Sequence, residues 1–156
     1  MTDETEAAIA GITELTAQSP AMSSTLKGRH AELLATIALM ANGWTIMEPT
    51  SPEAFDMAIK RPDSKRTLYV QVKTAMLRDE ERYNGAWLVV KGAKNNGKVY
   101  GLDEIDYFIA VYRGDVYMFE NAEKGEYWAR PWEVDDKWTK LDVGIHAEII
   151  EKGADI

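Results

Sequence analysis

The segment Thr67–Thr74 constrains the fold more than any other part of the sequence. Its inner residues alternate strictly, with Leu68, Val70 and Val72 on one face and Tyr69, Gln71 and Lys73 on the other. An alternation with a period of two predicts a β-strand that turns one face toward the core. The other face then carries an amide and an ammonium group side by side on the surface of a sheet.

The remaining segments predict a mixed sheet with helices packed on it. Apolar residues recur at helical spacing through Leu26–Ala41, and the hydroxyls of Ser23-Ser24-Thr25 precede them as candidate caps. The expected strands are Trp44–Glu48, Phe55–Ile59, Trp87–Val90, Tyr107–Tyr112 and Val116–Glu120, the last two joined by a tight turn. Pro131–Trp138 is a further candidate helix, and Ile145–Ile150 a further candidate strand. This order favours an α/β or mixed α+β fold.

The length of the chain limits its organisation. A chain of 156 residues fits one domain of ordinary size and has no room for a second enzymatic domain. Residues 1–22 hold four acidic residues and no basic one, and predict an acidic tail or a short amphipathic helix. Residues 23–156 then form the single domain.

The net charge of −8 is unevenly distributed along the chain. Residues 21–100 hold 12 basic and 8 acidic residues, whereas residues 101–156 hold 6 basic and 14 acidic residues. Two interpretations stay open: a basic face with an acidic rear, or scattered surface charge between two acidic ends. The net charge taken alone argues against nucleic-acid binding, which depends on phosphate contacts, but charge does not decide between these two interpretations.

The sequence lacks the residues that several functional classes require. The absence of cysteine excludes disulfides, thiol nucleophiles and cysteine-bound metals. The sequence also lacks the nucleophile elbow of serine hydrolases and the glycine-rich phosphate loop of nucleotide-binding proteins. The acidic start is unlike a signal peptide and no apolar run reaches membrane-spanning length, so we expect a soluble, cytoplasmic protein without a membrane partner.

Asp56, Gln71 and Lys73 form the strongest candidate site. Asp56 lies at the start of a predicted strand, and Gln71 and Lys73 share the polar face of the next one. If the two strands are hydrogen-bonded neighbours, these three side chains converge on one spot. Such a set suits phosphodiester hydrolysis, which needs oxygen ligands for a hard cation and a positive group beside the nucleophile. The backbone carbonyl of Val72 is a further candidate ligand.

Glu32 is a second candidate acid, on the predicted helix. Its carboxylate would restore negative charge to a site in which Gln71 contributes only a neutral amide oxygen. The alternative is an ordinary surface glutamate on the polar side of the helix. Spacing alone leaves both interpretations open.

Four sequence blocks over roughly residues 26–119 resemble the PD-(D/E)XK nuclease superfamily. They are KGRHAELLATIALMANGWTIMEP, FDMAI, LYVQVKTAMLR and DYFIAVY. The pattern is similar in particular to the branch of Holliday-junction-resolvase-like enzymes and related group I intron endonucleases, in which Gln replaces the Glu of the E-x-K motif. One departure is Phe55, where the superfamily heading has Pro before the aspartate.

This resemblance implies a restriction-endonuclease-like core, in which a central mixed sheet is flanked by helices. It also implies Asp56 as the main metal ligand, Glu32 as the helix acid, Gln71 at the position of the replaced acid and Lys73 as the catalytic lysine. The implied activity is that of an endonuclease that cuts DNA with Mg²⁺, for which Mn²⁺ substitutes. Junction or branched DNA is the favoured substrate.

The sequence also leaves alternative functions open and predicts which partners the protein has. The alternatives are a sequence-specific homing or restriction-type endonuclease, a catalytically relaxed protein that binds DNA, and one that binds a protein partner. A junction needs two cuts and one small domain carries one site, so we expect a homodimer or a higher symmetric oligomer. The candidate DNA contacts are Lys27, Arg29, Lys60, Arg78, Lys94 and Lys98.

Overall fold

The computed structural model describes residues 3–16 and 23–145. Two helices come first, α1 (Asp3–Thr16) and α2 (Ser24–Ala41), and a short helix α3 (Val134–Lys137) lies near the end. The strands are β1 (Thr45–Met47), β2 (Met57–Lys60), β3 (Thr67–Thr74), β4 (Met76–Glu80), β5 (Gly85–Lys91), β6 (Tyr107–Tyr112), β7 (Asp115–Glu120), β8 (Glu126–Ala129) and β9 (Thr139–Leu141). A 3₁₀ turn, η1 (Glu81–Tyr83), links β4 to β5. No helix in the described part of the chain is long and apolar enough to cross a membrane.

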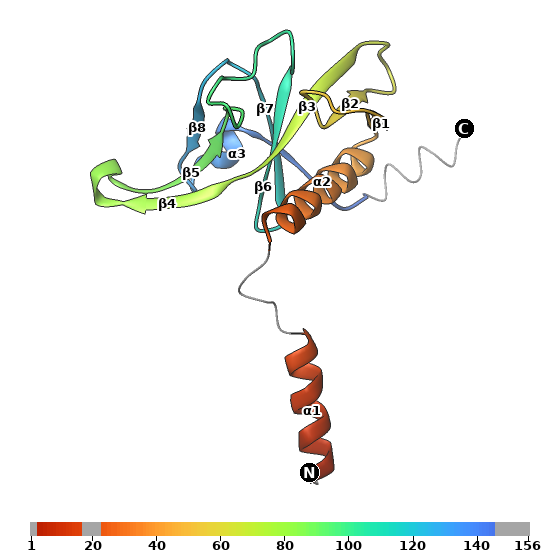
Figure 1. Cartoon of the computed structure of the whole chain (residues 1–156), viewed down its shortest axis with the longest axis vertical. Helices are drawn as coiled ribbons and strands as arrows, with labels where there is room; N and C mark the ends of the chain where they lie inside the picture. The colour runs from red at the N-terminus through yellow and green to blue at the C-terminus, as the bar shows by residue number, and fades with distance from the viewer. Residues whose placement is uncertain (1–2, 17–22, 146–156) are drawn as a thin grey trace.

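The strands form two sheets (Figure 1). The larger has six strands in the order β1-β2-β3-β6-β7-β9, and the smaller has three in the order β4-β5-β8. In the larger sheet β3 and β6 are parallel, while the other neighbours are antiparallel. The predicted mixed sheet flanked by helices is therefore confirmed.

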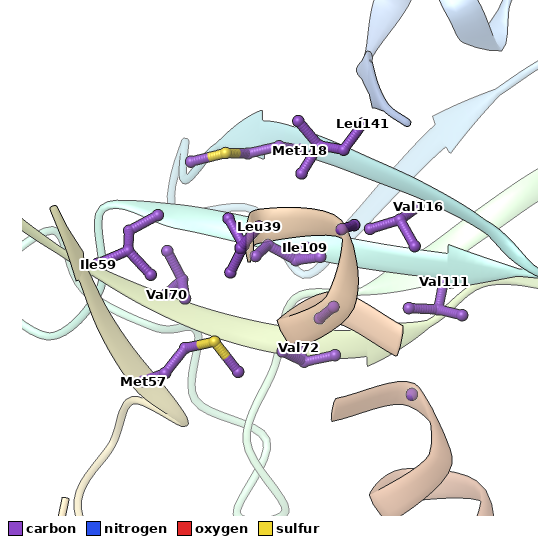
Figure 2. Packing of buried hydrophobic residues seen from close by; sticks show 13 residues of the cluster. Leu39, Met57, Ile59, Val70, Val72, Ile109, Val111, Val116, Met118 and Leu141 are labelled. Atoms are coloured by element: carbon purple, nitrogen blue, oxygen red, sulfur yellow. The ribbon is translucent and has the colours of Figure 1, made fainter. Parts of the chain in front are cut away.

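Helix α2 covers one face of the six-stranded sheet. Ser23 caps its N-terminus by accepting a hydrogen bond from the Leu26 backbone N–H at 3.2 Å. Its buried face consists mainly of alanines around Leu39, and such small side chains let the helix backbone approach the sheet closely. Figure 2 shows apolar side chains of β2, β3, β6, β7 and β9 gathered beside this helix.

The opposite face of the six-stranded sheet packs against the smaller sheet and α3, through an aromatic core. Phe119 stacks on Trp138 with ring centroids 4.8 Å apart and contacts Tyr127 at 4.8 Å. Phe108 stacks on Phe119 at 5.6 Å. Because both faces are covered, the four inner residues of β6 and of β7 are all buried, as in sheets buried on both sides.

The predicted strands are confirmed with shifted bounds. The strand Thr67–Thr74 is observed as predicted, as is the hairpin of β6 and β7. Its two-residue turn places Arg113 at φ 47° and Gly114 at φ 84°, as a twist-compatible hairpin turn requires. The strand expected over Phe55–Ile59 instead covers Met57–Lys60, so Asp56 lies immediately before it.

The C-terminal part differs more from the prediction. Of the helix expected over Pro131–Trp138, only Val134–Lys137 is helical. Strands β4, β8 and β9 were not expected, since their short sequences carry no clear alternation. The strand expected over Ile145–Ile150 lies outside the described residues except for Ile145, which belongs to no strand. The amphipathic helix considered for the N-terminus is present as α1, and the division into residues 1–22 and 23–156 stays a prediction.

Replacing Leu39 by alanine tests the packing of α2. Leu39 is fully buried, and Leu39→Ala should lower the free energy of unfolding by about 2–5 kcal/mol through lost burial and a residual cavity. Leu26 on the same helix is 55% exposed, so Leu26→Ala should change it by no more than about 0.5 kcal/mol. Urea unfolding of both variants measures this, and equal losses would contradict the assigned helix face.

Candidate active site

The candidate site lies where β3 extends beyond its neighbour β2. Strand β2 begins at Met57, which pairs with Val70, and runs back along β3 to Lys60 opposite Thr67. The second half of β3 therefore has β6 on one side and no residue of β2 on the other. Along this edge the last residues of β3, Gln71–Thr74, have no partner in β2.

Asp56 is fixed at this edge by two hydrogen bonds to β3. Its backbone N–H donates to the Val70 carbonyl at 2.9 Å. Its carboxylate oxygen Oδ2 accepts from the Val72 backbone N–H at 2.8 Å. The side chain thus takes the place of a backbone partner beyond the end of β2, and no hydrogen bond among the described residues engages its Oδ1.

Asp56, Gln71 and Lys73 line one cleft, with a volume of about 600 Å³. Gln71 and Lys73 share the face of β3 that points away from α2, as the alternation predicted. The structure therefore brings together the three residues that the sequence singled out. The remaining lining residues are Glu53, Ala54, Lys94, Asn95, Asn96 and Tyr100.

Tyr100 contributes a wall that the sequence did not indicate. The Lys73 Nζ lies 5.3 Å from the centroid of its ring, and the Lys94 Nζ lies 5.6 Å from it. Both ammonium groups are within the range of cation–π attraction. Tyr100 is 7% exposed, and its isolated position in the sequence carried no signal of this role.

Asn121 holds the segment that begins with Tyr100. This buried side chain donates from Nδ2 to the carbonyls of Tyr100 at 3.0 Å and Ile105 at 3.1 Å, while its Oδ1 accepts from the Tyr127 hydroxyl at 3.1 Å. Its backbone N–H donates to the Asp106 carbonyl at 2.9 Å. A fully bonded buried amide rigidifies what it contacts, so Asn121 determines where the Tyr100 wall stands. No local pattern in the sequence points to Asn121, because its partners are distant along the chain.

The cleft disfavours the ionised forms of Asp56 and Lys73. Burial raises the pKa of Asp56 above its usual value and the nearby Glu32 raises it further, whereas the hydrogen bond from Val72 and the charge of Lys73 lower it. Burial also lowers the pKa of Lys73, against the favourable charge of Asp56, and Lys91 adds to the lowering. Asp56 is thus a partly desolvated carboxylate, and a cation beside it would relieve the cost of its ionisation.

Glu32 is close to Asp56 but does not line the cleft. It lies on α2 and accepts a hydrogen bond from Arg29 at 3.2 Å, in an exposed ion pair. Its charge still contributes to the raised pKa of Asp56. Glu32 therefore has features of both interpretations, with a surface ion pair and a position close enough to influence the site.

The candidate DNA contacts do not form one group around the cleft. Lys94 lines the cleft, paired with Glu104, and Arg78 lines a second hollow beyond Lys73. Lys60 lies at the far end of β2, where its Nζ donates to the Arg61 carbonyl at 3.1 Å. Lys27, Arg29 and Lys98 are exposed and lie outside the cleft.

The oxygen donors of the cleft suit a hard cation better than a soft one. No group of three His, Cys, Asp or Glu side chains that could hold a metal occurs within residues 3–16 and 23–145. A cation here would rest on Asp56 with neutral oxygens, namely the Gln71 amide and the Val72 carbonyl. In a strand the N–H and C=O of one residue point to the same side, so the Val72 carbonyl faces the open edge beside Asp56.

The two layers over a central mixed sheet form a nuclease-like fold, as a comparison with solved structures shows. The chain is similar to the structure of a bacterial homing endonuclease, I-Ssp6803I, with a TM-score of 0.55 and 22% sequence identity. The alignment covers 86% of this chain and 96% of that one. No protein-family model and no curated protein matches the chain.

Replacing Asp56 by asparagine tests the electrostatic cost of the site. Asn keeps an oxygen for the Val72 N–H but removes the charge, so Asp56→Asn should raise the free energy of unfolding at pH 7. The raised folded-state pKa of Asp56 means that its stabilising contribution is complete below the unfolded pKa and is lost as the pH rises through the folded pKa.

The gain from Asp56→Asn should therefore vanish when the pH falls below about 3.9, the ordinary aspartate pKa, because both side chains are then neutral. Urea unfolding of the two proteins at a series of pH values measures the difference. A variant that is less stable than the wild type at pH 7 would contradict the raised pKa.

Proposed function

We propose that this protein is a metal-dependent endonuclease that hydrolyses phosphodiester bonds of DNA. The observation that carries the proposal is the convergence of Asp56, Gln71 and Lys73 on the open edge of β3, within one cleft. The fold shared with a homing endonuclease supports it. The sequence resemblance to PD-(D/E)XK nucleases with a Q-x-K motif assigns the same three positions.

Mg²⁺ is the proposed cation, with Mn²⁺ as a substitute. Asp56, Gln71 and the Val72 carbonyl would hold it directly, and Glu32 would act from α2 through water. When bound, such a cation polarises the phosphoryl oxygen and lowers the pKa of water. Asp56 is held ready for this role, because Val72 fixes one carboxylate oxygen and leaves the other available.

Lys73 is the proposed partner of the nucleophile. Its ammonium group lies in the cleft beside Asp56, and the ring of Tyr100 restricts its position. From there it would donate a hydrogen bond to the attacking hydroxide and stabilise the negative charge that develops on the phosphoryl oxygens. The lowered pKa of Lys73 also makes it a better proton donor than a solvent-exposed lysine.

Lys73→Ala should reduce cleavage by at least about 10²-fold, because it removes a preorganised donor from the developing charge. Lys65→Ala is the matched control, since Lys65 is an exposed lysine outside the cleft, and it should cut like the wild type. Cleavage of labelled DNA with Mg²⁺ or Mn²⁺ measures both, and thermal unfolding checks that the fold is kept. Unchanged turnover of Lys73→Ala would refute this mechanism.

The substrate has two candidates. Junction or branched DNA is favoured by the resemblance to junction resolvases and by the small size of the domain. A duplex of defined sequence is favoured by the fold similarity to a homing endonuclease. A panel of labelled junction, flap, linear duplex and single-stranded DNA separates them. Binding without any metal-dependent cutting would instead support a nuclease fold retained for binding.

A homodimer is proposed because two strands must be cut and the described chain carries one such cleft. The outer face of α2 offers an apolar stripe for a second copy, with Leu33, Ile37 and Met40 at helical spacing and Met40 64% exposed. Two copies of one helix face form the self-complementary contact that a twofold axis requires.

Ile37→Glu should therefore shift the protein from dimer to monomer at micromolar concentration, because a charge in the contact would be desolvated. Leu102→Glu is the control, since Leu102 is an exposed apolar residue outside α2. Light scattering after size-exclusion chromatography measures the mass of each. A wild-type monomer, or a dimer that survives Ile37→Glu, would contradict this interface.

A further inference from the structure

A second hollow meets the cleft at Lys73. It has a volume of about 950 Å³ and lies over the smaller sheet, with Lys91, Arg78, Tyr83 and Trp128 among its lining residues. Lys73 lines both this hollow and the cleft. A strand of nucleic acid with one phosphate in the cleft would therefore reach the hollow directly past Lys73.

Lys91 and Lys73 place two positive charges at this junction. Lys91 ends β5, is exposed, and lines the hollow together with Lys73. Neither lysine takes part in an ion pair within the described part of the chain. Asp56 offsets part of the charge of Lys73 from the cleft, whereas an anion in the hollow would lie beside both ammonium groups and relieve their mutual repulsion.

Glu126, the residue opposite Lys91 in the β5–β8 ladder, is occupied elsewhere. Its Oε2 accepts from Arg78 at 3.1 Å and from the Trp128 indole N–H at 3.0 Å. Glu126 therefore fixes Arg78 at the rim of the hollow, and its negative charge is already shared. The hollow keeps an excess of positive charge in a protein whose net charge is −8.

The wall of the hollow is suited to phosphate more than to a stacked base. The Arg78 guanidinium lies 4.8 Å from the centroid of the Trp128 ring and 5.8 Å from that of Tyr83. The two rings pack edge to face at 5.1 Å. Arg78 thus occupies the aromatic surface on which a base would stack, while a guanidinium has five N–H donors and keeps some for a phosphate.

We infer that this hollow is a second phosphate-binding subsite, which holds the DNA strand next to the bond that is cut, with Lys91 as the main contact and Arg78 as the second. The inference rests on the proposed function for its ligand, DNA. It adds to that function the path of the DNA strand, which would leave the cleft past Lys73 and run over β5 and β4. Lys91 is then a positioning residue, which acts on the strand and not on the reacting atoms.

The test is the salt dependence of DNA binding without cleavage. A fluorescein-labelled duplex and a labelled four-way junction are titrated with the full-length protein in EDTA at several salt concentrations. Each phosphate contact contributes about 0.9 to the slope of log affinity against log salt concentration for duplex DNA. Lys91→Ala should therefore reduce that slope by about 0.9, and Lys91→Glu should weaken binding further. Lys65→Ala should leave the slope unchanged.

The outcomes test the phosphate subsite separately from the proposed catalysis. A reduced slope for Lys91→Ala supports the subsite, even if the wild type cuts none of the DNAs and the proposed catalysis fails. An unchanged slope overturns the subsite, even if the wild type cuts DNA in a metal-dependent way. A slope that falls equally for Lys91→Ala and Lys65→Ala, or a wild type that binds neither DNA, also overturns it. Because Lys91 is exposed, these variants should keep the thermal unfolding midpoint of the wild type.

Discussion

The difference in length between β2 and β3 is the constraint on which the candidate site depends. β3 has eight residues and β2 has four, so half of one edge of a central strand has no strand partner from β2. The parallel partner β6 still holds the other edge. At Val72 the strand is therefore held by β6 on one side, and the Val72 N–H on the other side is satisfied by the Asp56 carboxylate at 2.8 Å. An open strand edge is usually a liability, and here a side chain terminates it.

The two hydrophobic cores support this edge from both faces of the large sheet. Within that rigid frame, the cleft disfavours the ionised forms of the groups that line it. α2 covers one face of the large sheet, and the aromatic core with the small sheet covers the other. Against this support, burial raises the pKa of Asp56 and lowers that of Lys73. Functional sites commonly hold groups whose ionisation is costly to stability. A bound cation and a phosphate would each offset part of this cost.

Net charge is a poor guide to what this chain binds. The chain is acidic overall, yet Lys73, Lys91, Lys94 and Arg78 all line the cleft or the hollow beside it. Two of the acids near them are already paired, Glu104 with Lys94 and Glu126 with Arg78. Recognition depends on the local field and not on the average. Under the proposed function, DNA would be held along this short basic path although the chain as a whole is acidic.

Local periodicity by itself determined the helix α2, the strand β3, the β6–β7 hairpin and the shared face of Gln71 and Lys73, because each of these depends on neighbours a few residues apart. Only the tertiary structure decided what those residues meet. The strands β4, β8 and β9, the Tyr100 wall and the Asn121 amide depend on partners far along the chain. Asp56 illustrates both. Its position in the sequence suggested a metal ligand, but its carboxylate can accept a hydrogen bond from Val72 only because β2 begins one residue later, at Met57. Long-range pairing sets such distances, and no local pattern records them.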